Sequence, residues 1–169
     1  NPDGEDKLGQ LMMRLTRITD WGDFSLFVMP GFRERTFPGE EGRLRTRFPV
    51  SDLDPRYESR HQRWHPDLAL RWRHYFGNAD IGLHYFHGTS RDPLFEPIQT
   101  VDGEIELLTV YNLIDQFGVD LQYTWDAWLW KLEGIARSGL DQHVQALTAG
   151  FEYTLFDWSA TGWDLGFLL

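Results

Sequence analysis

The sequence predicts an all-β protein, an antiparallel up-and-down transmembrane β-barrel of about eight strands. Three observations predict this fold class: apolar and polar residues alternate with a period of two, aromatic residues end the apolar runs, and short connections alternate with long ones. Successive side chains of a strand point to opposite faces, so the alternation makes one apolar and one polar face. Ionisable residues at mid-strand on the polar face are typical of a wall between lipid and water.

Four strands are predicted in the first half of the chain, over residues 8–19, 24–32, 68–76 and 81–88. In the third of them, Leu70 and Trp72 fall on one face and Arg71 falls on the other. The break after this strand contains Gly77 and Asn78, two residue types that tolerate the positive φ of a tight turn. The third and fourth strands are therefore expected to form a hairpin.

Four further strands are predicted in the second half, over residues 116–125, 128–137, 143–156 and 162–169. The alternation is clearest in the first of these. Val119, Leu121 and Tyr123 share one parity, while Asp120 and Gln122 share the other. One face of this strand is therefore apolar with an aromatic end, and the other carries polar and charged groups.

The connections between these strands differ in length. Short breaks are predicted at 20–23, 77–79, 126–127 and 157–161, an intermediate one at 138–142, and long ones at 34–66 and 89–115. Within the last of these, residues 104–114 fit either a short helix or a strand extension, and the pattern does not decide between them. Every second connection of a meander lies at the same end, so the chain is expected to have short periplasmic turns and long extracellular loops.

Three stretches of the second half, residues 116–124, 128–133 and 150–154, resemble uncharacterised porin-like outer-membrane proteins of Gram-negative bacteria. The resemblance implies a place in the bacterial outer membrane. Such relatives are generally longer and end on an aromatic residue, whereas this sequence ends on Leu169. The resemblance therefore implies that residues 1–169 are either a single barrel domain or, more in keeping with those lengths, a contiguous part of a larger barrel.

The composition excludes several classes of protein. The formal net charge of −10 argues against a nucleic-acid binder, and the absence of cysteine excludes disulfides and thiolate metal sites. No apolar run is long enough for a transmembrane helix, while alternation keeps the mean hydropathy of a barrel low, here −0.44. His61 and His65 have the spacing of two ligands, but they lie in a segment rich in Arg and Pro. No metal site is therefore expected.

The charged residues of the polar faces are the predicted lining of a pore. They are Arg71, Arg73, His84, Asp120, Lys131, Glu133, Arg137, Glu152 and Asp164. Opposed acidic and basic side chains would set a transverse field that selects solutes, so the expected function is passive passage of small hydrophilic solutes without a cofactor. The alternative is that these side chains form ion pairs that plug a narrow lumen, as in a non-conducting structural or adhesin-like barrel.

The aromatic residues of the apolar faces and turns are the predicted membrane-interface belt. They are Trp72, Tyr85, Tyr123, Trp125, Trp128, Trp130, Tyr153, Trp158 and Trp163. Amphipathic rings settle at the level of the lipid headgroups, and several of these residues lie next to turns. The alternative is a carbohydrate-stacking platform on a soluble β-sandwich.

An enzymatic alternative is a hydrolase of outer-membrane lipid or lipopolysaccharide. Ser90 lies near His87 in the sequence, and Ser138 lies near His143, so each pair is a candidate nucleophile and base. Neither serine is within a Gly-x-Ser-x-Gly motif. The sequence therefore favours a protein without catalytic residues.

The expected partners are outer-membrane lipid, lipopolysaccharide and small hydrophilic solutes. An arginine-rich segment is a candidate for binding lipopolysaccharide phosphates, because guanidinium matches phosphate bidentately. Its arginines are Arg33, Arg35, Arg43, Arg45 and Arg47. Acidic residues are interspersed with them, and a solvated loop with internal ion pairs is the favoured interpretation.

Overall fold

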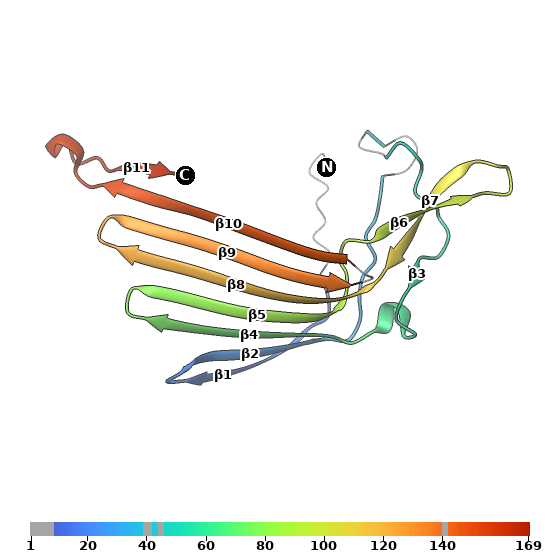
Figure 1. Ribbon diagram of the computed structural model, residues 1–169, viewed down its shortest axis with the longest axis horizontal. Coiled ribbons are helices and arrows are strands. Elements are labelled where there is room, and N and C mark those ends of the chain that lie inside the picture. The colour runs from blue at the N-terminus through green and yellow to red at the C-terminus, as the bar shows by residue number, and fades with distance from the viewer. Residues whose placement is uncertain (1–8, 39–41, 44–45, 140–141) are drawn as a thin grey trace. The chain divides into compact units, whose positions relative to one another are not determined.

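The computed structural model describes residues 9–38, 42–43, 46–139 and 142–169, and it is all-β. The described residues contain no α-helix; their helical elements are two short 3-10 turns, η1 (Gln62–Trp64) and η2 (Trp158–Ala160). The strands form an eight-stranded antiparallel sheet and a separate three-stranded sheet (Figure 1). The predicted all-β class is confirmed.

The larger sheet contains all eight of the strands that the sequence predicts. Their order is β1 (Met13–Thr19), β2 (Gly22–Met29), β4 (Asp67–Phe76), β5 (Ala79–Thr89), β8 (Leu113–Trp125), β9 (Trp128–Gly139), β10 (Gln142–Leu155) and β11 (Leu165–Leu168). Neighbours in this order are hydrogen-bonded, and β1 and β11 are its two ends. The antiparallel sheet of eight strands is therefore confirmed, whereas this sheet is not closed into a barrel.

The first and last strands are shorter than predicted. The first begins at Met13, and the last covers only Leu165–Leu168, although the pattern predicts strands over 8–19 and 162–169. Residue 8 lies outside the described residues. Before the last strand, the backbone N–H of Asp157 donates to Asp164 Oδ1 at 3.0 Å, which ties Asp164 into the connection. Residues 156–164 thus form a connection longer than the short turn predicted at 157–161.

Residues 104–114 contain no helix: residues 105–111 form one strand, and residues 113–114 begin β8. Strand β7 (Ile105–Tyr111) pairs antiparallel with β6 (Leu94–Gln99) and parallel with β3 (Arg56–Tyr57) in the smaller sheet. The sequence pattern indicates neither β3 nor β6. Strand β6 contains Pro97, which lacks a backbone N–H, and it lies at an edge of the sheet, where a missing donor is tolerated.

Three connections of the larger sheet are tight turns that the sequence predicts, and the first of them consists of Asp20 and Trp21 between β1 and β2. Strands β4 and β5 are joined by Gly77 and Asn78, and β8 and β9 are joined by Asp126 and Ala127. Gly77 has φ 58° and Asp126 has φ 53°, the left-handed conformation that matches the twist of a two-residue hairpin. Between β9 and β10, only residues 140–141 intervene, and they lie outside the described residues.

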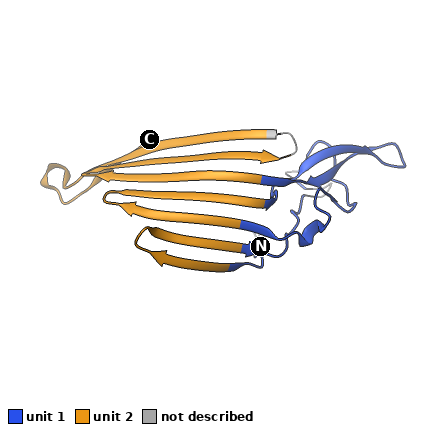
Figure 2. Ribbon diagram, turned by 60° about the horizontal axis from the view of Figure 1, so that its bottom comes forward, with its two compact units in different colours: residues 1–13, 28–68, 88–114 blue, residues 14–27, 69–87, 115–169 orange. Residues whose placement is uncertain are grey.

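The chain divides into two compact units, of which unit 1 comprises residues 1–13, 28–68 and 88–114 (Figure 2). Every described apolar residue that is buried belongs to unit 1: Met29, Phe32, Val110, Tyr111 and Ile114. Tyr111 is 1% exposed, and its ring lies 4.7 Å from that of Phe32 and 5.5 Å from that of Tyr57. Unit 1 therefore has a small core of its own.

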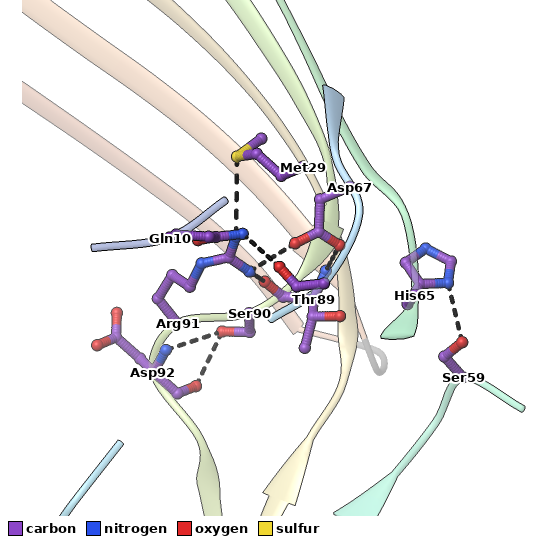
Figure 3. A network of polar contacts seen from close by, with 10 residues as sticks. Gln10, Met29, Ser59, His65, Asp67, Thr89, Ser90, Arg91 and Asp92 are labelled. Carbon is purple, nitrogen blue, oxygen red and sulfur yellow. Dashed lines mark hydrogen bonds and ion pairs between the residues drawn. The ribbon is translucent and has the colours of Figure 1, made fainter. Parts of the chain in front are cut away.

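Unit 1 also contains an ion pair in which the carboxylate is buried (Figure 3). Asp67 is fully buried, and its Oδ2 lies 2.7 Å from Nη1 of Arg91. The backbone N–H of Thr89 donates to Asp67 Oδ1 at 2.8 Å, and Arg91 Nη2 donates to Oε1 of Gln10 at 3.0 Å. A Cβ on Gly88 would lie 2.3 Å from Asp67 Oδ1, so only glycine fits beside this carboxylate. The buried charge is therefore compensated by closely packed neighbours.

Unit 2 comprises residues 14–27, 69–87 and 115–169, which include most of the larger sheet. None of its described apolar side chains is buried. Leu70 is 53% exposed, Phe117 is 50% exposed and Leu147 is 71% exposed. A soluble sheet normally buries its apolar face against a second layer. Unit 2 instead leaves this face exposed.

Candidate functional site

Charged side chains of unit 2 gather on one face of the larger sheet and contact one another across the strands. Arg71 Nη2 on β4 lies 3.1 Å from Asp120 Oδ1 on β8, although β5 lies between these strands. His84 Nδ1 on β5 is 3.9 Å from the same oxygen. Glu133 on β9 is directly opposite Asp120, so its side chain points to the same face. These four predicted pore-lining residues therefore share one face.

Two ion pairs extend this charged face toward the short turns. Arg73 Nη2 lies 2.6 Å from Asp80 Oδ2, which joins β4 to β5. Lys131 on β9 forms an ion pair with Glu152 on β10. Arg73, Lys131 and Glu152 are predicted pore-lining residues, and Asp80 is a partner that the sequence pattern did not single out. Cations and anions therefore both occur on this face, and three cation–anion pairs join its strands.

The last two predicted pore-lining residues differ from each other. Arg137 on β9 donates a hydrogen bond from Nε to Oε1 of Gln116 on β8, at 2.8 Å. Asp164 lies in the connection between β10 and β11, where its carboxylate accepts the backbone N–H of Asp157. The structure therefore places Arg137 within a strand of the sheet, whereas Asp164 stabilises a turn.

Glycine lies beneath two of the charged side chains. A Cβ on Gly82 would lie 2.2 Å from Asp120 Oδ2, and a Cβ on Gly118 would lie 2.1 Å from Nε2 of His84. Both distances are far below van der Waals contact, so any larger residue would push these side chains away from the sheet. The two glycines therefore allow Asp120 and His84 to lie flat against the charged face.

A hollow of about 540 Å³ lies over this part of the charged face. Its lining includes the cations Arg71 and Lys131 and the anions Asp80, Asp120 and Glu133. Opposed charges around a hydrated space produce a transverse field, which can orient and select small charged or polar solutes. Selection of this kind needs no nucleophile and no cofactor.

The opposite face of unit 2 is apolar. Leu70 and Trp72 on β4, Leu83 on β5 and Phe117 on β8 border a second hollow of about 390 Å³ on this face. The same face continues across β9 and β10, where Trp130 is 46% exposed. Because these side chains alternate with the charged ones along each strand, the sheet has two chemically distinct faces.

Five predicted belt residues form one aromatic cluster on the apolar face, next to the turn at 126–127. In the register of β8, β9 and β10, Tyr123 is opposite Trp130, Trp125 is opposite Trp128, and Trp128 is opposite Tyr153. The ring centroids of Trp128 and Tyr153 are 4.5 Å apart, and those of Trp128 and Trp130 are 5.6 Å apart. The structure therefore brings these five aromatic residues together.

The other four predicted belt residues lie outside this cluster. Trp72 donates from Nε1 to the carbonyl oxygen of Trp21 at 2.9 Å, in the turn between β1 and β2. Trp158 and Trp163 lie in the connection between β10 and β11, where the N–H of Trp158 donates to the oxygen of Trp163. Tyr85 lies on β5, away from the short turns. Contact of all nine with a membrane interface stays a prediction.

A row of polar residues crosses the apolar face at the end of the strands opposite to the short turns, and it includes the pair Ser138 and His143 that the sequence singled out. Asp115 on β8 is opposite Ser138 on β9, and Ser138 is opposite His143 on β10. On β5, the hydroxyl of Tyr85 donates to Asp115 Oδ1, and Nδ1 of His87 lies 2.9 Å from that oxygen. The row joins three separate segments of the sequence, around residues 85–87, 115 and 138–143, and the pairing of the strands brings these segments together.

The enzymatic and metal alternatives gain little from the structure. Ser90 is buried, and its hydroxyl donates to the carbonyl oxygen of Asp92 at 2.8 Å, within its own loop. Ser138 belongs to the polar row. The described part of the chain contains no group of three His, Asp or Glu side chains that could hold a metal ion. His65 instead has Nδ1 2.8 Å from Oγ of Ser59.

The arginine-rich segment already uses some of its cations internally. Arg35 forms an ion pair with Asp92 at 3.0 Å, and the guanidinium of Arg47 lies over the ring of Phe48 at 5.6 Å. Arg45 lies outside the described residues. Binding of lipopolysaccharide phosphates by this segment stays a prediction.

Among the described residues, no helix is both long enough and apolar enough to cross a membrane. The chain matches no protein-family model, no curated protein and no solved structure. The resemblance to porin-like proteins therefore stays a prediction, and the two faces of the larger sheet are the main indication of function.

Proposed function

We propose that the chain is a porin-like β-barrel of the bacterial outer membrane, or a contiguous part of one, through which small hydrophilic solutes pass passively. In this proposal the charged face of unit 2 lines a water-filled lumen, and the apolar face contacts lipid. No residue acts as a catalyst and no cofactor takes part. Selectivity arises from the width of the lumen and from the field of the opposed charges.

The exposed apolar face is the observation that carries the proposal. Burial of apolar surface contributes about 25 cal/mol per Å², so side chains such as Leu147 and Phe117 favour an apolar surrounding. The reverse orientation would place Arg71 and Lys131 in lipid, at a cost of about 2–4 kcal/mol each near the centre of a bilayer. Lipid on the apolar face and water on the charged face is therefore the favourable arrangement.

The lengths of the strands also support the proposal. Strand β5 has 11 residues, β8 has 13, β9 has 12 and β10 has 14. A tilted strand needs about 9–11 residues to cross a bilayer, whereas strands of soluble proteins most often have about 5–6. These four strands are thus long enough to span a membrane.

The apolar face is also divided into zones along the strands. Along β10, the residues of this face are in order polar, aliphatic and aromatic: His143, Gln145, Leu147, Ala149, Phe151 and Tyr153. A membrane barrel has an outward apolar band with amphipathic side chains at its edges, where the headgroups lie. The aliphatic zone matches the band, and the aromatic and polar zones match its two edges.

Closure of the wall is part of the proposal. Within a bilayer, every backbone N–H and C=O must be paired, so a sheet that spans it has no free edge. We therefore propose that β1 and β11 pair with each other or with further strands. The strand ends that lead into the long connections are assigned to the extracellular side. Gly82 and Gly118 favour an open lumen over a plugged one, because the charged side chains above them lie flat.

Conductance tests the proposal. The full chain is extracted from outer membranes in detergent, checked for heat-modifiable gel migration and inserted into planar bilayers. We expect stable channels, and a shift toward anion selectivity in the double variant Asp120→Asn, Glu133→Gln, because two negative charges leave the lumen. Asp126→Asn, in a turn, is the control and is expected to leave selectivity unchanged.

Two results would contradict parts of this function. Solubility in buffer without detergent would exclude a membrane protein. A heat-modifiable membrane protein that does not conduct would exclude a channel, and a plugged, structural barrel would replace it.

A further inference from the structure

We infer that the polar row formed by Tyr85, His87, Asp115, Ser138 and His143 binds the headgroup of a lipid that carries a primary ammonium and a phosphate. This inference rests on the proposed function, since it requires that the apolar face contacts lipid. It adds a binding site on the outside of the wall, separate from the charged face. The ligand class is a phosphoethanolamine group. Because these strand ends are assigned to the extracellular side, its carrier is lipopolysaccharide, and a synthetic phosphatidylethanolamine serves as the probe of the headgroup.

The register of three strands places the row on one face. Asp115, Ser138 and His143 are directly opposite one another across β8, β9 and β10, so their side chains point to the same side. Adjacent strands are about 4.8 Å apart. An acceptor on Asp115 and a donor on Ser138 are thus one strand spacing apart, which suits an ammonium and a phosphate joined by a two-carbon linker.

Asp115 is the expected site of the ammonium group. Its side chain is 51% exposed, and its contacts with Tyr85 and His87 are both made through Oδ1. These two neighbours hold the carboxylate through one oxygen, and the inferred ligand contact is to the other, Oδ2. A primary ammonium can donate to this oxygen, and a charge-assisted hydrogen bond is stronger than a neutral one. A quaternary ammonium has no N–H and cannot form it.

Ser138 and His143 are the expected phosphate site. The serine hydroxyl and an imidazole N–H are donors, and His143 adds a positive charge when it is protonated. Ser138 is the second-to-last residue of β9, which ends at Gly139, and His143 is the second residue of β10, which begins at Gln142. Near a membrane interface the cost of an outward charge falls to about 0–1 kcal/mol. The row therefore lies where headgroups would be.

The order of the residues favours binding over hydrolysis. In a Ser-His-Asp relay, the imidazole lies between the serine and the carboxylate. Here Ser138 lies between Asp115 and His143. A carboxylate next to the serine disfavours the negative charge that develops on an attacked ester. The row is thus suited to hold a headgroup rather than to cleave an ester.

Native mass spectrometry of the detergent-solubilised full chain tests the inference. The protein is titrated with dioleoylphosphatidylethanolamine or dioleoylphosphatidylcholine, which have the same acyl chains. We expect tighter binding of the first lipid. Asp115→Asn and Ser138→Ala should each weaken that binding by about tenfold, the effect of losing one hydrogen bond to a charged group.

Asp126→Asn is the matched control, because it makes the same chemical change at the opposite end of β8, in the turn. It should bind the ethanolamine lipid as the unmodified chain does, and heat-modifiable migration verifies that each variant is folded. Equal affinity for both lipids in a chain that still conducts would overturn this inference alone. Release of a lysolipid would also overturn the inference, because the row would then be the active site of a hydrolase. A chain soluble without detergent would overturn the proposed function and the inference with it.

Discussion

The two units treat apolar side chains in opposite ways. Unit 1 buries Phe32, Tyr111 and their neighbours in a small core, as a water-soluble domain does. Unit 2 contains longer strands, yet none of its described apolar side chains is buried. Since both units belong to one chain, composition alone does not account for the difference. The comparison supports the proposal that unit 2 contacts an apolar surrounding, whereas unit 1 buries apolar side chains in a core of its own.

The two units also differ in their ion pairs. In unit 1, Asp67 is fully buried and depends on Arg91. In unit 2, the side chains of Arg71 and Asp120 are 45% and 33% exposed. A buried charge that loses its partner is costly, whereas an exposed pair contributes little to stability. The buried charge of Asp67 therefore has a structural role in unit 1, and in the proposed function the exposed charges of Arg71 and Asp120 are available for solutes.

The largest expected effect is in unit 1. Arg91→Ala removes the cation from the buried carboxylate of Asp67, and we expect it to lower the free energy of unfolding by about 3–5 kcal/mol. Urea unfolding measures the loss. Arg71→Ala is the comparison in unit 2 and should cost only about 0–1 kcal/mol. Similar losses in the two variants would remove this difference between the units.

The next largest effect is a difference in stability between substitutions on the two faces of unit 2. Leu147→Arg places a charge on the apolar face of β10, and we expect it to lower the stability of the lipid-folded chain by about 2–4 kcal/mol. Thr148→Arg is its neighbour on the charged face, opposite Glu133, and should have little effect. The measurement is urea unfolding in lipid vesicles. Equal tolerance of both arginines would mean that neither face contacts lipid.

A smaller effect concerns the glycines of the charged face. Gly82→Val would force Asp120 away from the sheet, and overpacking of this kind costs about 1–3 kcal/mol. Gly166→Val is the control, because a Cβ at Gly166 meets no atom within 4 Å. The conductance of the two variants is compared. A change in Gly82→Val alone would show that the position of Asp120 affects the lumen. An unchanged lumen in Gly82→Val would show that Asp120 need not lie flat.

The smallest effect is an alkaline loss of stability in unit 1. Burial raises the pKa of Tyr57 above its ordinary value of 10.0, with a further contribution from Glu34, and burial also raises the pKa of Tyr111. The stabilisation of the neutral rings is complete below the ordinary pKa and is lost as the pH rises through the folded pKa. We expect unfolding midpoints to fall only above about pH 10. Tyr57→Phe should reduce this alkaline loss of stability. An equal loss in this variant would mean that Tyr57 is not its source.

Much of the sheet could be predicted from the sequence, because a period of two marks both the strands and their faces. The pattern over residues 116–125 is regular enough to place Asp120 and Leu121 on opposite sides. Pairing between distant strands could not be predicted in this way. The short strand β3 and the edge strand β6 have no such pattern, and the bond between Thr89 and Asp67 depends on residues brought together only by folding.

The candidate site was predictable to a similar degree. Parity located Arg71, His84 and Glu133 within strands, where the structure also has them. Asp164 was assigned to a strand because apolar alternation continues through Trp163, but its carboxylate stabilises a turn. The polar row at Asp115 was not predicted, since neither the register nor the contacts across strands can be read from one sequence.

We propose that alternate residues of unit 2 face lipid and water, and single cysteines can report the surroundings of each residue. The chain has no cysteine of its own, so Leu147→Cys, Thr148→Cys and Ala149→Cys can each carry one fluorophore in lipid vesicles. We expect brominated lipid to quench the probes at 147 and 149, and aqueous iodide to quench the probe at 148. Equal quenching of all three by iodide would contradict the account, because the apolar face would then be in water.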